Sequence, residues 1–152
     1  MRLYYLIDSL GLVISAIGIM SFIPCISALI YGDMFSLILF AILGVITTIV
    51  GHLMHRLTPS EKLLNLKKTE ALAIVLLSWV SFWLIASIPF LFYGLTPINA
   101  LFEAISGITS CGATILTSFD FPKTFFFWRS FIQWLGGMGI IILFTAVLPQ
   151  FA

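Results

Sequence analysis

The chain alternates long apolar runs with short polar breaks. Apolar residues dominate from Leu10 to Tyr31, from Met34 to Leu53 and from Ala71 to Tyr93, and a fourth apolar run follows Arg129. Each run is close to the roughly 20 residues that a helix needs to cross a bilayer. The pattern therefore predicts four membrane-spanning helices with short connections.

The first two runs form a predicted hairpin. Only Gly32 and Asp33 separate them, which leaves room for a tight turn between antiparallel helices. The first helix is expected to bend near Pro24, because proline cannot donate the hydrogen bond that a helix interior requires. The third run is expected to end at Pro89 and Gly94, since these residue types commonly stop helices.

The polar stretch from His52 to Glu70 sets the expected orientation. It holds four of the seven basic residues of the chain, which are Arg56, Lys62, Lys67 and Lys68. Basic residues in short loops resist translocation, so we expect this stretch and both termini on the cytoplasmic side. Residues 58–61 are compatible with a short interfacial helix. His52 and His55 lie three apart, but no carboxylate or cysteine at ligand spacing supports a metal site there.

Composition excludes several classes of protein. Hydrophobic residues make up 61% of the 152 residues and charged residues 9%, which is more apolar surface than a soluble domain of this size can bury. The net charge of +1 argues against nucleic-acid binding. Cys25 and Cys111 are far apart, so neither a disulfide framework nor a zinc site is expected. Because the common catalytic and phosphate-binding motifs are missing, we expect no enzyme activity and no organic cofactor.

The part of the segment from Thr96 to Phe121 that is compatible with a helix is too short to cross the membrane, and the segment is too structured for an ordinary loop. Thr96 and Pro97 form a helix start, with threonine at the N-cap and proline at the first helical position. A helix from Pro97 to about Thr109 would be roughly 18 Å long, a little over half of a hydrocarbon core of about 30 Å. The small and β-branched residues that follow favour non-helical backbone, which the membrane tolerates only in water-lined or protein-enclosed space. The segment therefore predicts a re-entrant loop.

Such a loop suits a monovalent cation. Extended backbone with a glycine, here Gly112, can turn successive carbonyl oxygens toward a common axis, where they replace the hydration shell of the ion. The negative end of the short helix dipole points to the same place. Gly112 is expected to tolerate a side chain least. The alternative, an ordinary outer loop between two helices, stays open at this point.

Two blocks of sequence carry a resemblance to a known family. They are residues 102–114, FEAISGITSCGAT, and residues 127–141, FWRSFIQWLGGMGII. Both resemble the first pore loop and the following helix of the Trk/Ktr-type potassium-uptake membrane subunits, and with the hairpin the similarity covers essentially the whole chain. The resemblance implies a potassium filter made by the backbone oxygens of Thr109, Ser110, Cys111 and Gly112. The family usually has threonine in place of Ser110 and Cys111, which bears on fine selectivity more than on carbonyl coordination.

The expected architecture is an all-α integral membrane protein with four spans and one re-entrant half-helix. Residues 1–56 form the hairpin, residues 57–70 a cytoplasmic linker and residues 71–152 one helix–pore-loop–helix unit. The resemblance implies four such units in a complete subunit, so one unit supplies about a quarter of a filter ring. We therefore expect a truncated or split subunit that needs further units to conduct. A non-conducting accessory or assembly protein and a homotetrameric cation channel remain alternatives.

The resemblance also implies a location and partners. The location is a bacterial cytoplasmic (inner) membrane. Besides the lipid bilayer, the expected partners are other pore-loop units or copies of this chain, and a cytoplasmic nucleotide-binding regulatory subunit. Potassium is the expected transported and bound ion.

Residues around the predicted filter are expected to support it. Glu103 would lie on the half-length helix, where an intramembrane carboxylate costs about 2.5–3.5 kcal/mol and so needs a partner or a role. Arg129 is one candidate partner, and its alternative role, snorkelling to the interface, has equal weight. Gly136, Gly137 and Gly139 are expected to permit close packing against the filter-bearing segment rather than to form a hinge.

Overall fold

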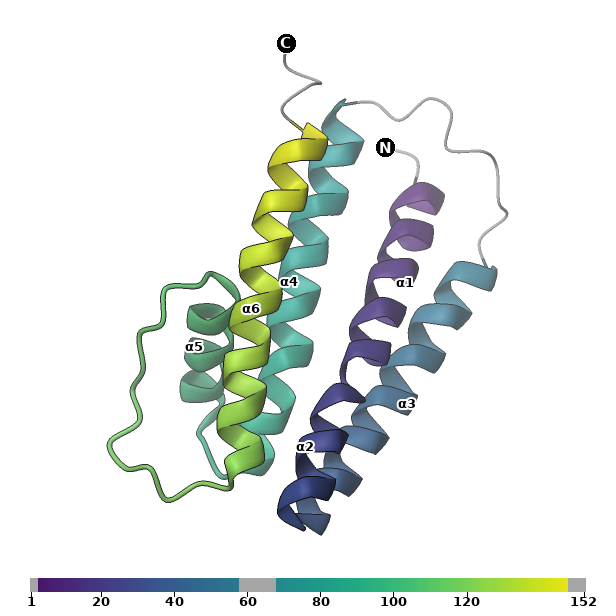
Figure 1. Cartoon of the computed structure of the whole chain (residues 1–152). Helices are drawn as coiled ribbons and strands as arrows, with labels where there is room; N and C mark the ends of the chain where they lie inside the picture. Colours follow the sequence, from purple (N-terminus) through teal and green to yellow (C-terminus); the bar gives the residue numbers. More distant parts are fainter. Residues whose placement is uncertain (1–2, 58–67, 148–152) are drawn as a thin grey trace. The chain divides into compact units, whose positions relative to one another are not determined.

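The computed structural model describes residues 3–57 and 68–147 of the chain (Figure 1). These residues form six helices and contain no strand. Three stretches are long and apolar enough to cross a membrane, namely Leu6–Tyr31, Met34–Arg56 and Thr69–Phe92. The chain is therefore an all-α integral membrane protein, as its sequence predicts. The short helix expected at residues 58–61 lies outside the described residues.

The chain divides into two compact units, residues 1–82 and 83–152. The boundary falls inside α4 (Lys68–Phe92), so each unit takes a part of that helix. The fourth predicted span corresponds to α6 (Lys123–Val147), and its crossing of the membrane stays a prediction. The division into residues 1–56, 57–70 and 71–152 also stays a prediction.

The first unit contains the hairpin. Its helices are α1 (Leu3–Met20), α2 (Ile23–Tyr31) and α3 (Met34–Leu57). The predicted bend near Pro24 is present as an interruption at residues 21–22, and Pro24 lies in the first turn of α2, where a missing N–H is tolerated. The first arm begins at Leu3 instead of Leu10, so the polar side chain of Asp8 lies within α1.

The hairpin turn has the residues that its geometry requires. Gly32 has a φ of 69°, in the left-handed region that glycine adopts without cost. Asp33 then starts α3, because its carboxylate accepts hydrogen bonds from the backbone nitrogen of Ser36 at 3.1 Å and from the Ser36 hydroxyl. The predicted tight turn at Gly32 and Asp33 is therefore confirmed.

The two arms of the hairpin approach at glycines. A Cβ atom on Gly51 of α3 would lie 2.3 Å from the backbone nitrogen of Ser15, and one on Gly11 of α1 would lie 2.7 Å from the carbonyl oxygen of Gly51. Such distances do not occur between real side chains and backbone. At one end of this contact, the His55 Nδ1 and Asp8 Oδ1 atoms are 2.7 Å apart. The hairpin is thus packed backbone against backbone, with the His55–Asp8 pair at one end, and Cys25 Sγ of α2 also donates to the carbonyl oxygen of Leu37 of α3 at 3.9 Å.

The second unit consists of the end of α4, α5 (Pro97–Ile108) and α6. The expected stop at Pro89 is wrong, because α4 continues through Pro89 to Phe92. A proline in the last turn removes only one hydrogen bond, and the chain then turns at Gly94, where φ is 95°. The buried Trp128 of α6 donates from Nε1 to the carbonyl oxygen of Ala86, 3.1 Å away, which fastens α6 to the end of α4.

Candidate functional site

The site begins with a helix of half-membrane length. Thr96 caps α5, with its Oγ1 accepting from the backbone nitrogen of Asn99 at 3.4 Å, and Pro97 opens the helix as the sequence predicts. At the other end, a Cβ atom on Gly136 would lie 1.8 Å from the carbonyl oxygen of Ile108. Gly136 lies roughly 20 Å along α6, at 1.5 Å per residue, so α5 ends against the middle of α6. The chain then returns as a loop to the start of α6 (Figure 1).

The backbone after α5 does not continue the helix. Ser110 has a φ of 57° and Gly112 a φ of 75°, both in the left-handed region. Serine in this conformation costs roughly 1–2 kcal/mol, and its hydroxyl is held by donation to the carbonyl oxygen of Gln133 on α6 at 3.1 Å. Gly112 adopts it freely. The small residues at these positions therefore allow the chain to curl back over the end of α5.

Three successive backbone N–H groups point back to the last turn of α5. The nitrogen of Ser110 donates to Gly107 O at 2.9 Å, and the nitrogens of Cys111 and Gly112 donate to Ser106 O at 3.1 and 3.3 Å. No described peptide bond is cis, and in a planar trans peptide the C=O of one residue points opposite to the N–H of the next.

The carbonyls of Thr109, Ser110 and Cys111 therefore point away from α5. All three residues are exposed. Within the described part of the chain, no donor reaches any of these three oxygens. The loop thus presents a row of three open carbonyls.

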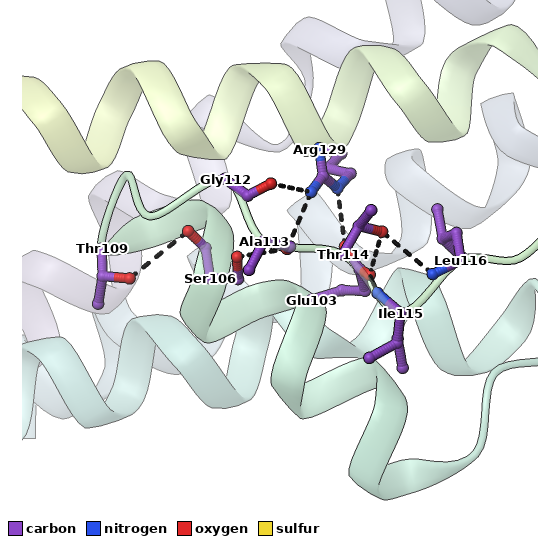
Figure 2. Close-up of polar contacts among 9 residues, drawn as sticks. All are labelled: Glu103, Ser106, Thr109, Gly112, Ala113, Thr114, Ile115, Leu116 and Arg129. Atoms are coloured by element: carbon purple, nitrogen blue, oxygen red, sulfur yellow. Dashed lines mark hydrogen bonds and ion pairs between the residues drawn. The ribbon is translucent and has the colours of Figure 1, made fainter.

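Glu103 lies beneath the loop and is fully buried. Its Oε1 atom accepts from the Thr114 hydroxyl at 2.6 Å and from the Ile115 backbone nitrogen at 2.9 Å (Figure 2). Its Oε2 atom is 2.7 Å from Nε of Arg129. The buried carboxylate is therefore both neutralised and hydrogen-bonded, which is the condition for keeping a charge away from water.

Arg129 also contacts the loop directly. Its Nη2 atom donates to the carbonyl oxygens of Gly112 and Ala113, at 3.2 and 3.1 Å (Figure 2). The side chain of Arg129 is 18% exposed and so lies mostly within this unit. Of the two roles weighed from the sequence, partner of Glu103 or snorkelling to the interface, the structure has the first.

The remaining site residues differ in how tightly they are placed. A Cβ atom on Gly112 would meet only Gln133 Nε2, 3.5 Å away, so the constraint at Gly112 is its backbone conformation and not space. Gly137 has comparable room, with Ser110 Oγ at 3.5 Å. Gly136 has none. For Gly139 the expected packing role stays a prediction.

Two contributors to the site were not anticipated from sequence. Ser106 donates its hydroxyl to Ala113 O at 2.5 Å and accepts two loop N–H groups on its backbone oxygen. Thr114 accepts from the Leu116 nitrogen at 3.2 Å while donating to Glu103. A usable signal existed, because hydroxyl residues that flank a non-helical segment are well suited to satisfy its backbone.

The arrangement offers oxygen ligands without a free negative charge. Among residues 3–57 and 68–147, no group of three or more His, Cys, Asp or Glu side chains could hold a metal ion. The open carbonyls are neutral, and hard oxygen ligands of this kind suit a monovalent cation that exchanges quickly.

The fold and the site together define an all-α integral membrane protein with a short helix, α5, and a loop after it that presents backbone carbonyls. Comparison with known proteins gives the family. The model of the TrkH family, described as cation transport protein, matches residues 36–152, and the chain belongs to this family.

Individual relatives cover the chain to different extents. The Trk system potassium uptake protein TrkH of Halomonas elongata is 33% identical over 98% of this chain and 31% of its own length. An uncharacterized cation transporter of Methanocaldococcus jannaschii is also 33% identical, over 93% of this chain and 30% of its own length. The TrkH protein of Escherichia coli is 43% identical over 56% of this chain and 18% of its own length. The chain thus spans less than a third of the length of these relatives.

Proposed function

We propose that this chain supplies one helix–pore-loop–helix unit to a potassium pathway across the membrane. The observation that carries the proposal is the row of open carbonyls at Thr109, Ser110 and Cys111, which follows from the N–H groups bonded to the end of α5. Four converging rows of this kind can replace the water shell of potassium. The names of the Halomonas and Escherichia relatives, both potassium uptake proteins, favour potassium among monovalent cations.

The end of α5 adds a favourable field. A helix carries a partial negative charge at its C-terminal end, and α5 ends at Ile108, directly before the open carbonyls. The charge of Glu103 is matched by that of Arg129 and does not reach the exposed surface. Selection for a cation therefore rests on dipoles and not on a fixed anion, which allows binding weak enough for release.

One unit gives one side of a filter. Further pore-loop units must complete it, either from further chain or from other copies, and a regulatory subunit on the cytoplasmic side is a further proposed partner. The basic stretch at residues 54–70 implies an orientation in a bacterial inner membrane. In this orientation both termini lie on the cytoplasmic side. Labelling from outside should then reach a cysteine placed at Asp33 and leave one placed at Lys67 unreacted.

The filter is tested in a complete subunit. Residues 1–152 would replace the matching segment of the Halomonas relative, and uptake of potassium would be measured in cells without their own uptake systems, with sodium as competitor. Gly112→Ser should abolish or relax potassium selectivity, because φ at Gly112 is 75° and a side chain is strained there. Cys111→Thr is the matched control and should change little, since the ligand is the backbone carbonyl. If Gly112→Ser transported like the parent while Cys111→Thr failed, side chains would be the ligands and the proposal would be wrong.

A further inference from the structure

The open carbonyls end abruptly at Gly112. The oxygens of Thr109, Ser110 and Cys111 have no described donor, whereas the next two carbonyls each accept a hydrogen bond from Arg129 Nη2, at 3.2 Å from Gly112 and 3.1 Å from Ala113. Ala113 O accepts in addition from the Ser106 hydroxyl. The change from open to occupied carbonyls therefore falls between two adjacent residues.

The geometry of Arg129 explains why the boundary is sharp. Its Nε atom is fixed by Glu103 at 2.7 Å, and Glu103 is itself fully buried and held by two loop donors. Because the guanidinium is planar, fixing Nε also directs Nη2. A lysine in this place has one nitrogen and could not reach the carboxylate and both carbonyls in the same geometry.

The charge on the donor matters as much as its position. A carbonyl oxygen that accepts from a guanidinium has part of its negative charge already engaged, and the guanidinium would repel a second cation brought to the same oxygen. Thr109, Ser110 and Cys111 carry no such donor. Gly112 is therefore distinct from them as a ligand, although it is essential to the bend of the chain.

We infer that Arg129 sets the length of the ion-facing row in this unit. Three carbonyls, those of Thr109, Ser110 and Cys111, face the ion, and Arg129 withdraws the fourth, that of Gly112. This inference rests on the proposed potassium pathway and narrows it. Arg129 is then a positioning residue for selectivity, acting through the backbone and touching no ion.

The test uses the complete chimeric subunit and the change Arg129→Lys, which keeps the positive charge near Glu103. Uptake of rubidium as a tracer and its inhibition by sodium would be measured together with the amount of protein in the membrane. Freed from Arg129, the Gly112 carbonyl can turn toward the ion and alter the ligand set. The expected result is a loss of preference for potassium over sodium of about tenfold, equal to about 1.4 kcal/mol, at an unchanged amount of protein. The same chemical change at an exposed position, Arg56→Lys, should leave the preference as in the parent.

Two further results would decide against the inference or the function behind it. If Arg129→Lys lowered only the amount of protein and kept the preference, Arg129 would be structural and the inference would be overturned. If Arg129→Lys failed to accumulate at all, the double change Glu103→Gln with Arg129→Gln, which leaves no unpaired charge, should show the same loss of preference. A parent chimera without any preference for potassium would overturn the proposed function, and this inference with it.

Discussion

The hairpin of α1–α3 and the proposed pore-loop unit of α5–α6 both contain glycines at close helix contacts, but the glycines serve different purposes. In the hairpin, Gly11 and Gly51 let two complete helices touch, and each helix already satisfies its own backbone hydrogen bonds. In the pore-loop unit, Gly136 lets the end of a helix touch another helix, and the chain beyond that end has lost its helical hydrogen bonds.

The difference lies in what replaces the lost bonds. The hairpin has few polar contacts between its described helices, and in the pair of His55 with Asp8 the side chains are 37% and 17% exposed. The pore loop is surrounded by the buried Glu103, by Arg129 and by hydroxyls that bond its backbone. In the apolar interior of a membrane, close packing is enough to hold two helices together. Non-helical backbone needs neighbouring donors and acceptors that satisfy its N–H and C=O groups.

The largest effect is expected at the junction of α5 and α6. Gly136→Ala should destabilise the pore-loop unit by more than about 3 kcal/mol, because its Cβ would lie 1.8 Å from Ile108 O and backbone cannot step aside. Thermal unfolding in detergent and the amount of protein in the membrane would measure it. The neighbouring change Gly137→Ala, with Ser110 Oγ 3.5 Å away, is the control and should shift stability by less than about 0.5 kcal/mol. Equal effects at the two glycines would contradict the close contact.

A smaller effect is expected in the hairpin. Gly51→Ala should cost about 1–3 kcal/mol, because its Cβ would lie 2.3 Å from the Ser15 nitrogen while two helices can still separate slightly. Gly44→Ala is the milder comparison, since the nearest atom, 2.9 Å away, belongs to the ring of Phe22, which can rotate. Neither change should alter ion preference in the chimera. A change of preference in Gly51→Ala would show that the hairpin shapes the filter and that the two regions do not act separately.

The smallest effect is expected at the polar pair. His55→Gln should lower stability by about 0.5–1 kcal/mol, the usual contribution of a partly exposed hydrogen bond. His52→Gln, at an exposed position three residues earlier, should have no measurable effect. Unfolding midpoints of the two variants in the same detergent give the comparison. A larger loss for His52→Gln would mean that the described pair is not the one that holds this end of the hairpin.

Sequence reasoning succeeded where the bilayer alone decides the structure. Run length predicted the three stretches that are long and apolar enough to cross a membrane, and the Thr96 cap with Pro97 predicted the start of α5. It failed at Pro89, because nothing local says whether a helix has one more turn to complete. It also missed the contact of Gly11 with Gly51, although glycines recur seven residues apart in both arms, at Gly11 and Gly18 and at Gly44 and Gly51.

The site was harder to predict than the helices. Glu103 and Arg129 were recognised as candidate partners because an intramembrane charge demands an explanation. The contact of Arg129 with Gly112 O depends on the left-handed turns at Ser110 and Gly112 and on the approach of α6. Such contacts join residues that no periodicity connects, so only the folded arrangement reveals them.

The contacts of Ser106 fix how many residues the loop can hold. Its backbone oxygen accepts hydrogen bonds from the N–H groups of Cys111 and Gly112, and its hydroxyl donates to Ala113 O. Three hydrogen bonds from Ser106 therefore fix the positions of the consecutive residues 111–113 relative to the end of α5. An insertion or deletion of one residue between Ser106 and Ala113 would turn a different set of carbonyls outward and leave Arg129 beside the wrong ones. Insertions and deletions between Ser106 and Ala113 should therefore disrupt the site. Insertions or deletions at residues 117–118 should be tolerated, because these residues have no described bond to Glu103, Ser106 or Arg129.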